Sequence, residues 1–466
     1  PGAPAMAFVR AAAEDAYDRL IFPSVEREMR GLLTEQADEG AIKMFGLNLK
    51  PLLMQPPVKG FVTMGLDPGY RNGCKVAVVD ATGKVLDTAV VYPTFSQRKK
   101  EEAIDTLAKL IRRHGVAHIA IGNGTASRET EQMTVELIRR LGGGVSYMIV
   151  NEAGASVYSA SKLAAEEFPD YDVNLRSAVS IARRLQDPLA ELVKIDPKSI
   201  GVGQYQHDMP QARLDETLSG VVEDCVNAVG VDLNTASAPL LSYVAGLNNT
   251  TARNIVKYRE ENGAFTTRKG VLKVPKLGPK AFEQCAGFLR VPESRNVLDH
   301  TGVHPESYGA AEALLTLCGY GLSDVKAGGL DGLRERVAAY GEEKAAQACG
   351  VGVPTLRDIV GELMKPGRDP RDELPRPILR TDVLEMKDLK PGMELTGTVR
   401  NVIDFGVFVD IGVHQDGLVH ISQLREGRRV QHPSEVCAVG DIVTVWVLEV
   451  DEKKKRISLT MKKPKG

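Results

Sequence analysis

The chain has no apolar run close to the roughly 20 residues that a membrane-spanning helix needs. Its first residues also lack the basic-then-apolar layout of a secretion signal. The six cysteines are scattered without a CxxC pair, which argues against a disulfide framework and favours reduced thiols in the cytoplasm. The formal net charge is −2, so no overall basic field indicates a polyanionic partner. Any nucleic-acid site must therefore be sought segment by segment.

Candidate metal ligands are equally sparse. His114 with His118, and His300 with His304, would each share one helix face, but no second pair of Cys or His supports a zinc site around either. A structural zinc ion needs four tetrahedral ligands. The sequence therefore predicts neither a metal site nor a cofactor.

The 466 residues are 43% hydrophobic and 26% charged, which is ordinary globular composition, and the length predicts roughly three domains. The first segment should hold two helices that are separated at Phe22-Pro23. Because the chain begins Pro-Gly-Ala-Pro rather than with Met, we expect it to be a fragment of a longer protein. Changes of period and composition divide it into a helical region (residues 1–58), an α/β layer domain (60–187), a helical domain with glycine-marked turns (190–300), a small helical domain (301–375) and a domain of short strands (388–462).

Residues 388–462 contain five short segments of strand character, which predicts an OB-type barrel. Phe405 and Phe408 flank Gly406 in one of them, and His420 follows in the next. A glycine in a strand marks a bulge or a close backbone approach, and a bulge would turn both rings to one face. Exposed aromatic rings on a small barrel are platforms for base stacking, although aromatic residues at strand spacing are also common in cores. Four arginines could follow a nucleic-acid backbone beside them: Arg400, Arg425, Arg428 and Arg429.

The amino-acid sequence of this segment resembles the S1 RNA-binding domain over its whole length. The resemblance is carried by Gly397-Thr-Val-Arg-Asn-Val-Ile-Asp-Phe-Gly-Val-Phe-Val-Asp, by Gly417-Leu-Val-His-Ile-Ser and by Arg456-Ile-Ser-Leu-Thr-Met. It implies that Phe405, Phe408 and His420 line a groove for single-stranded nucleic acid.

A second candidate is a basic helical region. Residues 246–290 hold nine Lys or Arg against three Glu. Two half-motifs, around Gly246 and Gly278, each suggest a helix, a tight turn and another helix, and they resemble tandem helix-hairpin-helix motifs. Such turns direct backbone N–H groups at a phosphate, with Lys276 and Lys280 adding charge. The same pair could instead be a protein-packing module.

The third candidate is Asp67, in Gly65-Leu-Asp-Pro-Gly-Tyr-Arg at the end of a predicted strand. With the strand and helix order βββαβαβα, this segment resembles the YqgF and Holliday-junction-resolvase branch of the RNase H-like superfamily. That resemblance implies three or four carboxylates around two divalent ions. Asp67 matches the first acid and Glu152 the second, but ungapped matching puts Arg176 at the final position. A cation there opposes metal binding, so we expect a degenerate centre without nuclease activity.

The order of the modules resembles the Tex family of bacterial transcription accessory proteins across the whole chain. The sequence similarity is strongest in Ile121-Gly-Asn-Gly-Thr-Ala-Ser, in Val150-Asn-Glu-Ala-Gly-Ala-Ser and in Ser180-Ile-Ala-Arg-Arg-Leu-Gln-Asp-Pro-Leu-Ala-Glu-Leu-Val-Lys. The resemblance implies the carboxy-terminal portion of such a protein, and it extends to the eukaryotic Spt-six elongation factor through the shared module order. It predicts a cytoplasmic, monomeric scaffold that binds single-stranded RNA or DNA and acts with the transcription elongation machinery. The alternatives are a metal-dependent nuclease and a protein-interaction platform.

Overall fold

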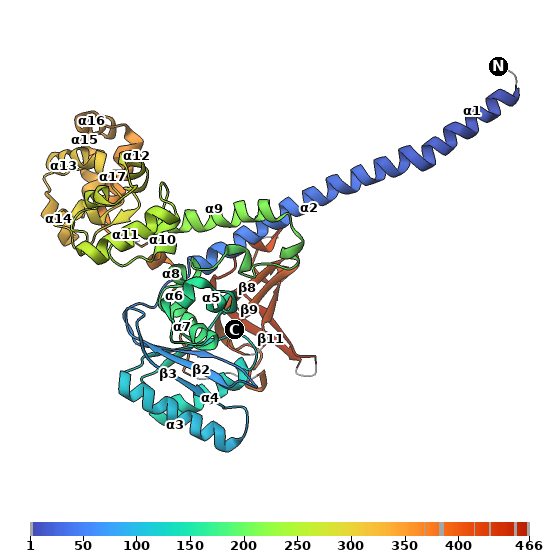
Figure 1. The fold of residues 1–466 in the computed structure, drawn as a ribbon, viewed down its shortest axis with the longest axis horizontal. Coiled ribbons are helices and arrows are strands. Elements are labelled where there is room, and N and C mark those ends of the chain that lie inside the picture. The colour runs from blue at the N-terminus through green and yellow to red at the C-terminus, as the bar shows by residue number, and fades with distance from the viewer. Residues whose placement is uncertain are drawn as a thin grey trace.

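The computed structural model describes residues 3–367, 369–381, 386–413, 415–427, 430–451 and 454–463. Figure 1 shows an α/β domain and a β-barrel side by side, a helical region to the upper left, and a long helical rod that leads away to the amino end. Among the described residues, no helix has both the length and the apolar character that crossing a bilayer requires.

The rod consists of α1 (Ala3–Ala16), the π-helical turn η1 (Tyr17–Ile21) and α2 (Phe22–Leu53). The predicted break at Phe22-Pro23 is wrong, because Pro23 stands in the first turn of α2, where a missing N–H is tolerated, directly after the wide π turn. The last turns of α2 are buried and lie against α9 (Gln211–Val229) (Figure 1).

The α/β domain is built on a five-stranded sheet with the order β3-β2-β1-β4-β5. Strands β1 to β3 are antiparallel, whereas β4 and β5 run parallel to β1. Gly65 allows α7 to approach β1, because a Cβ there would lie 2.1 Å from the Ala178 carbonyl oxygen. The strands are β1 (Thr63–Asp67), β2 (Cys74–Val79), β3 (Val85–Val91), β4 (His118–Gly122) and β5 (Ser146–Val150), and the helices are α3 (Gln97–His114), α4 (Ser127–Leu141), α5 (Ala155–Ala160), α6 (Lys162–Glu167), α7 (Val173–Gln186) and α8 (Pro188–Leu192).

The helical part contains two hydrophobic cores. One core is formed by the end of α2 together with the helices from α9 to α12. The other core lies among the helices from α13 to α17. The helices are α10 (Ala238–Ser242), α11 (Asn249–Asn262), α12 (Pro279–Cys285), α13 (Tyr308–Leu317), α14 (Leu322–Ala327), α15 (Leu333–Tyr340), α16 (Glu342–Cys349) and α17 (Val353–Met364), and the short strands β6 (Val231–Asp232) and β7 (Leu289–Arg290) pair beside them.

The last domain is a closed barrel with the order β10-β12-β11-β8-β9. Its core contains the inward residues of all five strands. The predicted fold class, an RNase H-like α/β domain with helical domains and an OB-type barrel, is confirmed. The strands are β8 (Glu394–Ile403), β9 (Gly406–Asp410), β10 (Gly417–His420), β11 (Ile442–Asp451) and β12 (Arg456–Thr460).

The segment that leads into the barrel is attached to the α/β domain. Arg371 is buried and forms ion pairs with Asp187 at 2.7 Å and with Asp369 at 2.8 Å. Further along, Arg380 exchanges two backbone hydrogen bonds with Tyr147 at the free edge of β5. The barrel therefore follows a linker that is fixed along the edge of the sheet.

Candidate nucleic-acid interface

The register of the barrel strands decides where the aromatic residues point. Val407 and Val409 have 0% exposure and belong to the barrel core, whereas Phe408, between them, is only partly buried and faces outward. Phe408 pairs with Leu418 of β10, and Gly406 pairs with His420. Because directly paired residues share a face, Phe408, Leu418 and His420 lie on one outer surface.

Phe405 reaches this surface from the turn between β8 and β9. Its side chain is 53% exposed, and its carbonyl oxygen accepts a hydrogen bond from the Ile421 N–H at 2.8 Å. Gly406 serves a close backbone approach, since a Cβ there would lie 2.4 Å from the Val419 carbonyl oxygen. The expected bulge at Gly406 is wrong: the register shift lies in β8, between Val399 and Asn401. The turn, rather than a bulge, lets Phe405 point outward.

His420 is exposed and has a defined orientation. Its Nδ1 accepts a hydrogen bond from the Ser422 N–H at 3.3 Å and lies 2.9 Å from the Ser422 hydroxyl. An Nδ1 that accepts leaves the proton of the neutral ring on Nε2. The ring can therefore offer a donor as well as a flat surface. We call Phe405, Phe408, Leu418 and His420 the barrel face.

The arginines predicted to contact nucleic acid differ in whether their charge is already paired within the protein. Arg400 is the residue at the register shift, and its guanidinium donates to Asp410 at 2.6 Å. Burial would raise the pKa of Asp410, but Arg400 and Arg380 hold it below its usual value. Arg400 is thus already paired, whereas Arg425 is exposed and lines a broad groove of about 870 Å³ together with Lys462. Arg428 and Arg429 lie outside the described residues.

One cation on this surface is absent from the sequence prediction. Arg456 is exposed at the start of β12, two residues before Ser458, which pairs with Leu418. Alternation along the strand puts Arg456 on the same outer surface as the barrel face. Its spacing from the aromatic residues depends on a parallel pairing that the sequence does not reveal.

The RNase H-like centre brings the first two predicted acids together. Asp67 ends β1 and Glu152 follows β5 by two residues. Burial raises the pKa of Asp67 to about 6, and the nearby Glu152 carboxylate adds to the rise. The Lys75 ammonium and a hydrogen bond from Ser177 act in the opposite direction. Lys75 is the register partner of Asp67 on β2, and it is 7% exposed.

The Glu152 carboxylate rests in the loop between β4 and α4. Cβ atoms at Gly122 and Gly124 would lie only 2.4 Å and 1.8 Å from its two oxygens. The pKa of Glu152 is raised by burial, while the Gly124 N–H and the Arg184 guanidinium counteract the rise. The glycines of Gly122-Asn-Gly therefore make room for an anion that belongs to the protein itself.

Arg176 does not stand at the final acidic position. Its guanidinium donates to the carbonyl oxygens of Phe168 at 3.1 Å and Ser159 at 3.3 Å, and Ser177 is the α7 residue that hydrogen-bonds to Asp67. Neighbouring positions of a helix point roughly 100° apart, so Ser177 faces Asp67 while Arg176 points elsewhere.

The described residues do not fit the two-ion centre that the resemblance implies. No group of three or more His, Cys, Asp or Glu that could hold a metal ion occurs in the described part of the chain. Asp67 and Glu152 provide two carboxylates, and the groups that offset their charge are Lys75 and Arg184.

The two helical hairpins have matching turns. Gly246 has φ +80° and Lys276 has φ +66°, so these two residues occupy equivalent left-handed positions. The pairing of Gly246 with Gly278 inferred from the sequence is thus displaced, and Gly278 corresponds to Asn248 as the residue that starts the following helix. The Asn248 side chain accepts hydrogen bonds from the first N–H groups of α11, whereas Gly278 provides no such cap for α12. Lys276 and Lys280 are both exposed beside this second turn.

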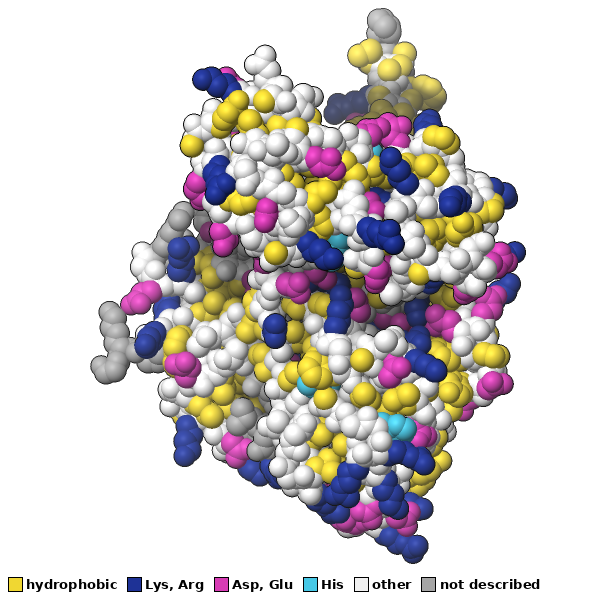
Figure 2. All heavy atoms as spheres, turned by 90° about the vertical axis from the view of Figure 1, so that its left-hand side faces the viewer, with side chains coloured by type: hydrophobic (Ala, Val, Ile, Leu, Met, Phe, Trp, Pro, Cys, Tyr) yellow, Lys and Arg dark blue, Asp and Glu magenta, His cyan; other side chains and the backbone are white. Residues whose placement is uncertain are grey.

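The basic excess of residues 246–290 is smaller at the surface than in the sequence. Arg268 is fully buried, and it donates to backbone carbonyl oxygens, as do the partly buried Arg259 and Arg290. Six of the nine cations remain exposed, against three exposed glutamates. Figure 2 shows Lys and Arg interspersed with Asp and Glu over one side of the molecule, without a continuous basic surface.

Family models match four parts of the chain. They describe a Tex protein YqgF-like domain (residues 61–186), a helix-hairpin-helix motif (226–290), an HHH domain (296–371) and an S1 RNA binding domain (388–462). The Bacillus subtilis protein named uncharacterized protein YdcI is 57% identical over 450 residues, which are 97% of this chain and 62% of that protein. The Neisseria gonorrhoeae transcriptional accessory protein Tex is 56% identical over 445 residues, 95% of this chain and 57% of that protein. The chain belongs to the Tex family.

This chain is also similar to a human protein. The human S1 RNA-binding domain-containing protein 1 is 40% identical over 506 residues, 96% of this chain and 50% of that protein. The chain spans between half and about three fifths of the length of these relatives. The HHH domain match covers residues 296–371 and so gives a class to most of residues 301–375, which the sequence pattern identified only as a small helical domain.

Proposed function

We propose that this chain is the nucleic-acid-binding scaffold of a bacterial transcription accessory protein, and that it binds single-stranded RNA chiefly through the barrel face. The observation that carries the proposal is the outward position of Phe405, Phe408 and His420 on an S1 domain. A protein rarely leaves several aromatic rings together on an outer surface without a partner for them.

Two physical effects would supply the binding free energy. Stacking of a base on an aromatic ring is worth about 1–3 kcal/mol and is tolerant of sequence. Exposed cations of the barrel, among them Arg425 and Arg456, would contribute the release of counterions, so affinity should fall as salt rises. DNA is the alternative ligand, and RNA is favoured because the matched family model is an RNA binding domain.

The test measures affinity for a single-stranded RNA by fluorescence anisotropy with Phe405→Ala, Phe408→Ala and His420→Ala. We expect each phenylalanine variant to weaken binding by roughly 5- to 100-fold, the equivalent of one lost stacking contact. Phe95→Ala is the matched control, because Phe95 is a 56% exposed phenylalanine in the α/β domain. Unchanged affinity in all three barrel variants would refute the stacking interface.

The second hairpin is proposed as an additional phosphate contact. Lys280 is exposed in the first turn of α12, next to the turn at Gly278 that no side chain caps. Lys280→Ala should weaken duplex and single-stranded ligands alike and lower the salt dependence of binding by about one ion. Unchanged affinity and salt dependence would instead support a protein-packing role for the hairpins.

We further propose that the RNase H-like centre does no chemistry. The Lys75 and Arg184 cations near Asp67 and Glu152 support this, and the alternative is a metal-dependent nuclease. Branched DNA and structured RNA incubated with Mg²⁺ or Mn²⁺ should remain intact. Cleavage that Asp67→Asn abolishes would establish the nuclease.

A monomeric, cytoplasmic protein that acts with the transcription elongation machinery completes the proposal. The three family classes and the name of the Neisseria relative support the transcription role. A protein-interaction platform with incidental nucleic-acid contacts is the remaining alternative. RNA binding that does not weaken between low and physiological salt would favour that platform.

A further inference from the structure

A cavity of about 390 Å³ lies where the barrel meets the α/β domain. The α/β domain contributes Tyr70, Asn123 and Arg128, and the barrel with its linker contributes Arg380, Arg400 and Asp416. We call this cavity the interdomain pocket. Its volume is at the small end of the range for ligand sites, which suits one nucleotide and excludes a duplex.

The interdomain pocket continues the barrel face. Asp410 lines the pocket and follows Phe408 by two residues on β9, so both point outward, about 7 Å apart along the strand. Asp416, which directly precedes β10, comes before Leu418 by the same interval. A strand stacked on Phe408 and leaving in this direction would therefore meet the pocket next.

The polar groups of the pocket suit a nucleobase better than a phosphate. Arg400 and Arg380 share Asp410, at 2.6 Å and 3.3 Å, and the further carboxylates of the lining, Asp416, Glu129 and Glu131, disfavour an anion. Asp416 is an acceptor, while Asn123 and the exposed Arg128 supply donors. A base edge carries donors and acceptors together, whereas a phosphate carries acceptors alone.

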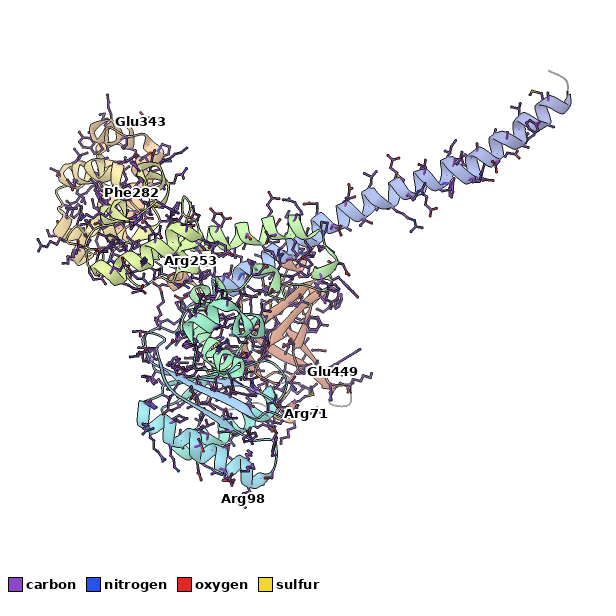
Figure 3. All side chains as sticks on the ribbon, viewed as in Figure 1. Arg71, Arg98, Arg253, Phe282, Glu343 and Glu449 are labelled. Carbon is purple, nitrogen blue, oxygen red and sulfur yellow. The ribbon has the colours of Figure 1, made fainter. Side chains whose placement is uncertain are left out.

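Tyr70 supplies the flat surface. Its ring is 45% exposed, and its hydroxyl donates to Glu129 at 2.9 Å, so the hydrogen bond anchors one end of the ring beside the pocket. Figure 3 labels its neighbour Arg71 on the side of the α/β domain next to the barrel, while Arg98 lies at the far end of that domain. The ring thus stands at the junction of the two domains.

We propose that the interdomain pocket receives one nucleobase of the strand that the barrel face binds, with Tyr70 as its stacking partner. This rests on the proposed function, since the barrel face must first hold the strand. The two sites together make the bound strand longer than the barrel alone can hold, and they fix its direction of exit toward the RNase H-like domain.

The experiment compares two single-stranded RNAs, one of about four nucleotides that the barrel alone can hold and one of about ten. Tyr70→Ala should weaken the longer RNA by roughly 5- to 100-fold and leave the shorter one unchanged. Tyr70→Phe should keep the wild-type affinity, because the ring remains. Tyr340→Ala, at an exposed tyrosine of α15, is the control and should change neither. Loss of binding to both RNAs by Tyr70→Ala would overturn the inference, because it would indicate general damage.

A third ligand distinguishes a base from the backbone. A ten-nucleotide RNA with abasic residues outside a central block of four should bind wild type and Tyr70→Ala equally. If Tyr70→Ala weakens the abasic and intact RNAs alike, the pocket contacts the backbone and the inference is overturned. If Phe408→Ala weakens both lengths while Tyr70→Ala weakens neither, the pocket is unused and the proposed function stands. If Phe408→Ala has no effect on either length, the proposed function fails together with the inference.

Discussion

Replacing Asp67 with Asn should stabilise the α/β domain near neutral pH. Burial, with the Glu152 charge, raises the pKa of Asp67 from 3.8 to about 6. Each unit of pKa difference between the folded and unfolded states corresponds to about 1.4 kcal/mol, so the ionised Asp67 costs the fold about 3 kcal/mol at pH 7. Asparagine has nearly the same shape and no charge.

The sign of the pH dependence follows from the number of bound protons. Between about pH 4 and pH 6 the folded state retains the Asp67 proton while the unfolded chain has released it. The stability of the wild-type domain should therefore fall as pH rises through this window and stay at the lower level above it. In Asp67→Asn the contribution of Asp67 to this fall should be absent, so the two proteins have similar stability near pH 4 and differ most at pH 7.

The measurement is thermal unfolding from pH 4 to pH 8, with hydrogen exchange of β1 and β2 to follow this domain. About 3 kcal/mol corresponds to a rise in the melting temperature of roughly 6–12 °C for a domain of this size. Trp446, the single tryptophan, lies in the barrel and reports on a domain that the substitution should leave unchanged. A destabilised Asp67→Asn protein at pH 7 would refute the reasoning, because it would show that the carboxylate makes a net favourable contact.

Two further substitutions test the local geometry. Gly124→Ala should displace the Glu152 carboxylate and lower the free energy of unfolding by about 1–3 kcal/mol, the cost of leaving a buried acceptor unsatisfied. In a Glu152→Ala background the same substitution should cost far less. Chemical unfolding measures both effects, and Gly201→Ala, with open space around it, is the control. Arg371→Ala should cost about 3–5 kcal/mol, because it leaves the Asp187 carboxylate without its buried partner, and hydrogen exchange should increase in residues 369–380; normal protection there would contradict the role of the ion pair.

The fold was predictable because its elements follow local patterns. The alternation that predicted the barrel strands also appears in their burial, with Val407 and Val409 inward and Phe408 outward. The switch from strand to helix periods in residues 60–187 likewise gave the sheet with its helices. A pattern with a period of two or 3.6 residues is a property of neighbouring residues, so the sequence carries it directly.

The errors concern contacts between distant segments and positions within turns. One residue separates Ser177, which faces Asp67, from Arg176, which the sequence placed at the acidic centre, and two residues separate Lys276, the structural counterpart of Gly246, from Gly278. The local charge excess also overestimated the surface charge, because Arg268 is a buried residue that bonds to backbone carbonyls. Which residue faces the acidic centre, which turn positions correspond and which arginine is buried all depend on contacts with distant segments, so neighbouring residues do not reveal them.

The acidic centre and the barrel face differ in how their free energy is balanced. Around Asp67 and Glu152, the Gly124 N–H and the Lys75 and Arg184 cations offset part of the carboxylate charge from within the fold, although burial still raises both pKa values. Cations that the fold itself places beside the acids reduce the electrostatic demand for an external ion. At the barrel face the reverse holds, because the rings of Phe405 and Phe408 lie outside the core and gain little from folding. Their favourable contacts can come only from something that binds, which is why we expect recognition at the barrel and no chemistry at the centre.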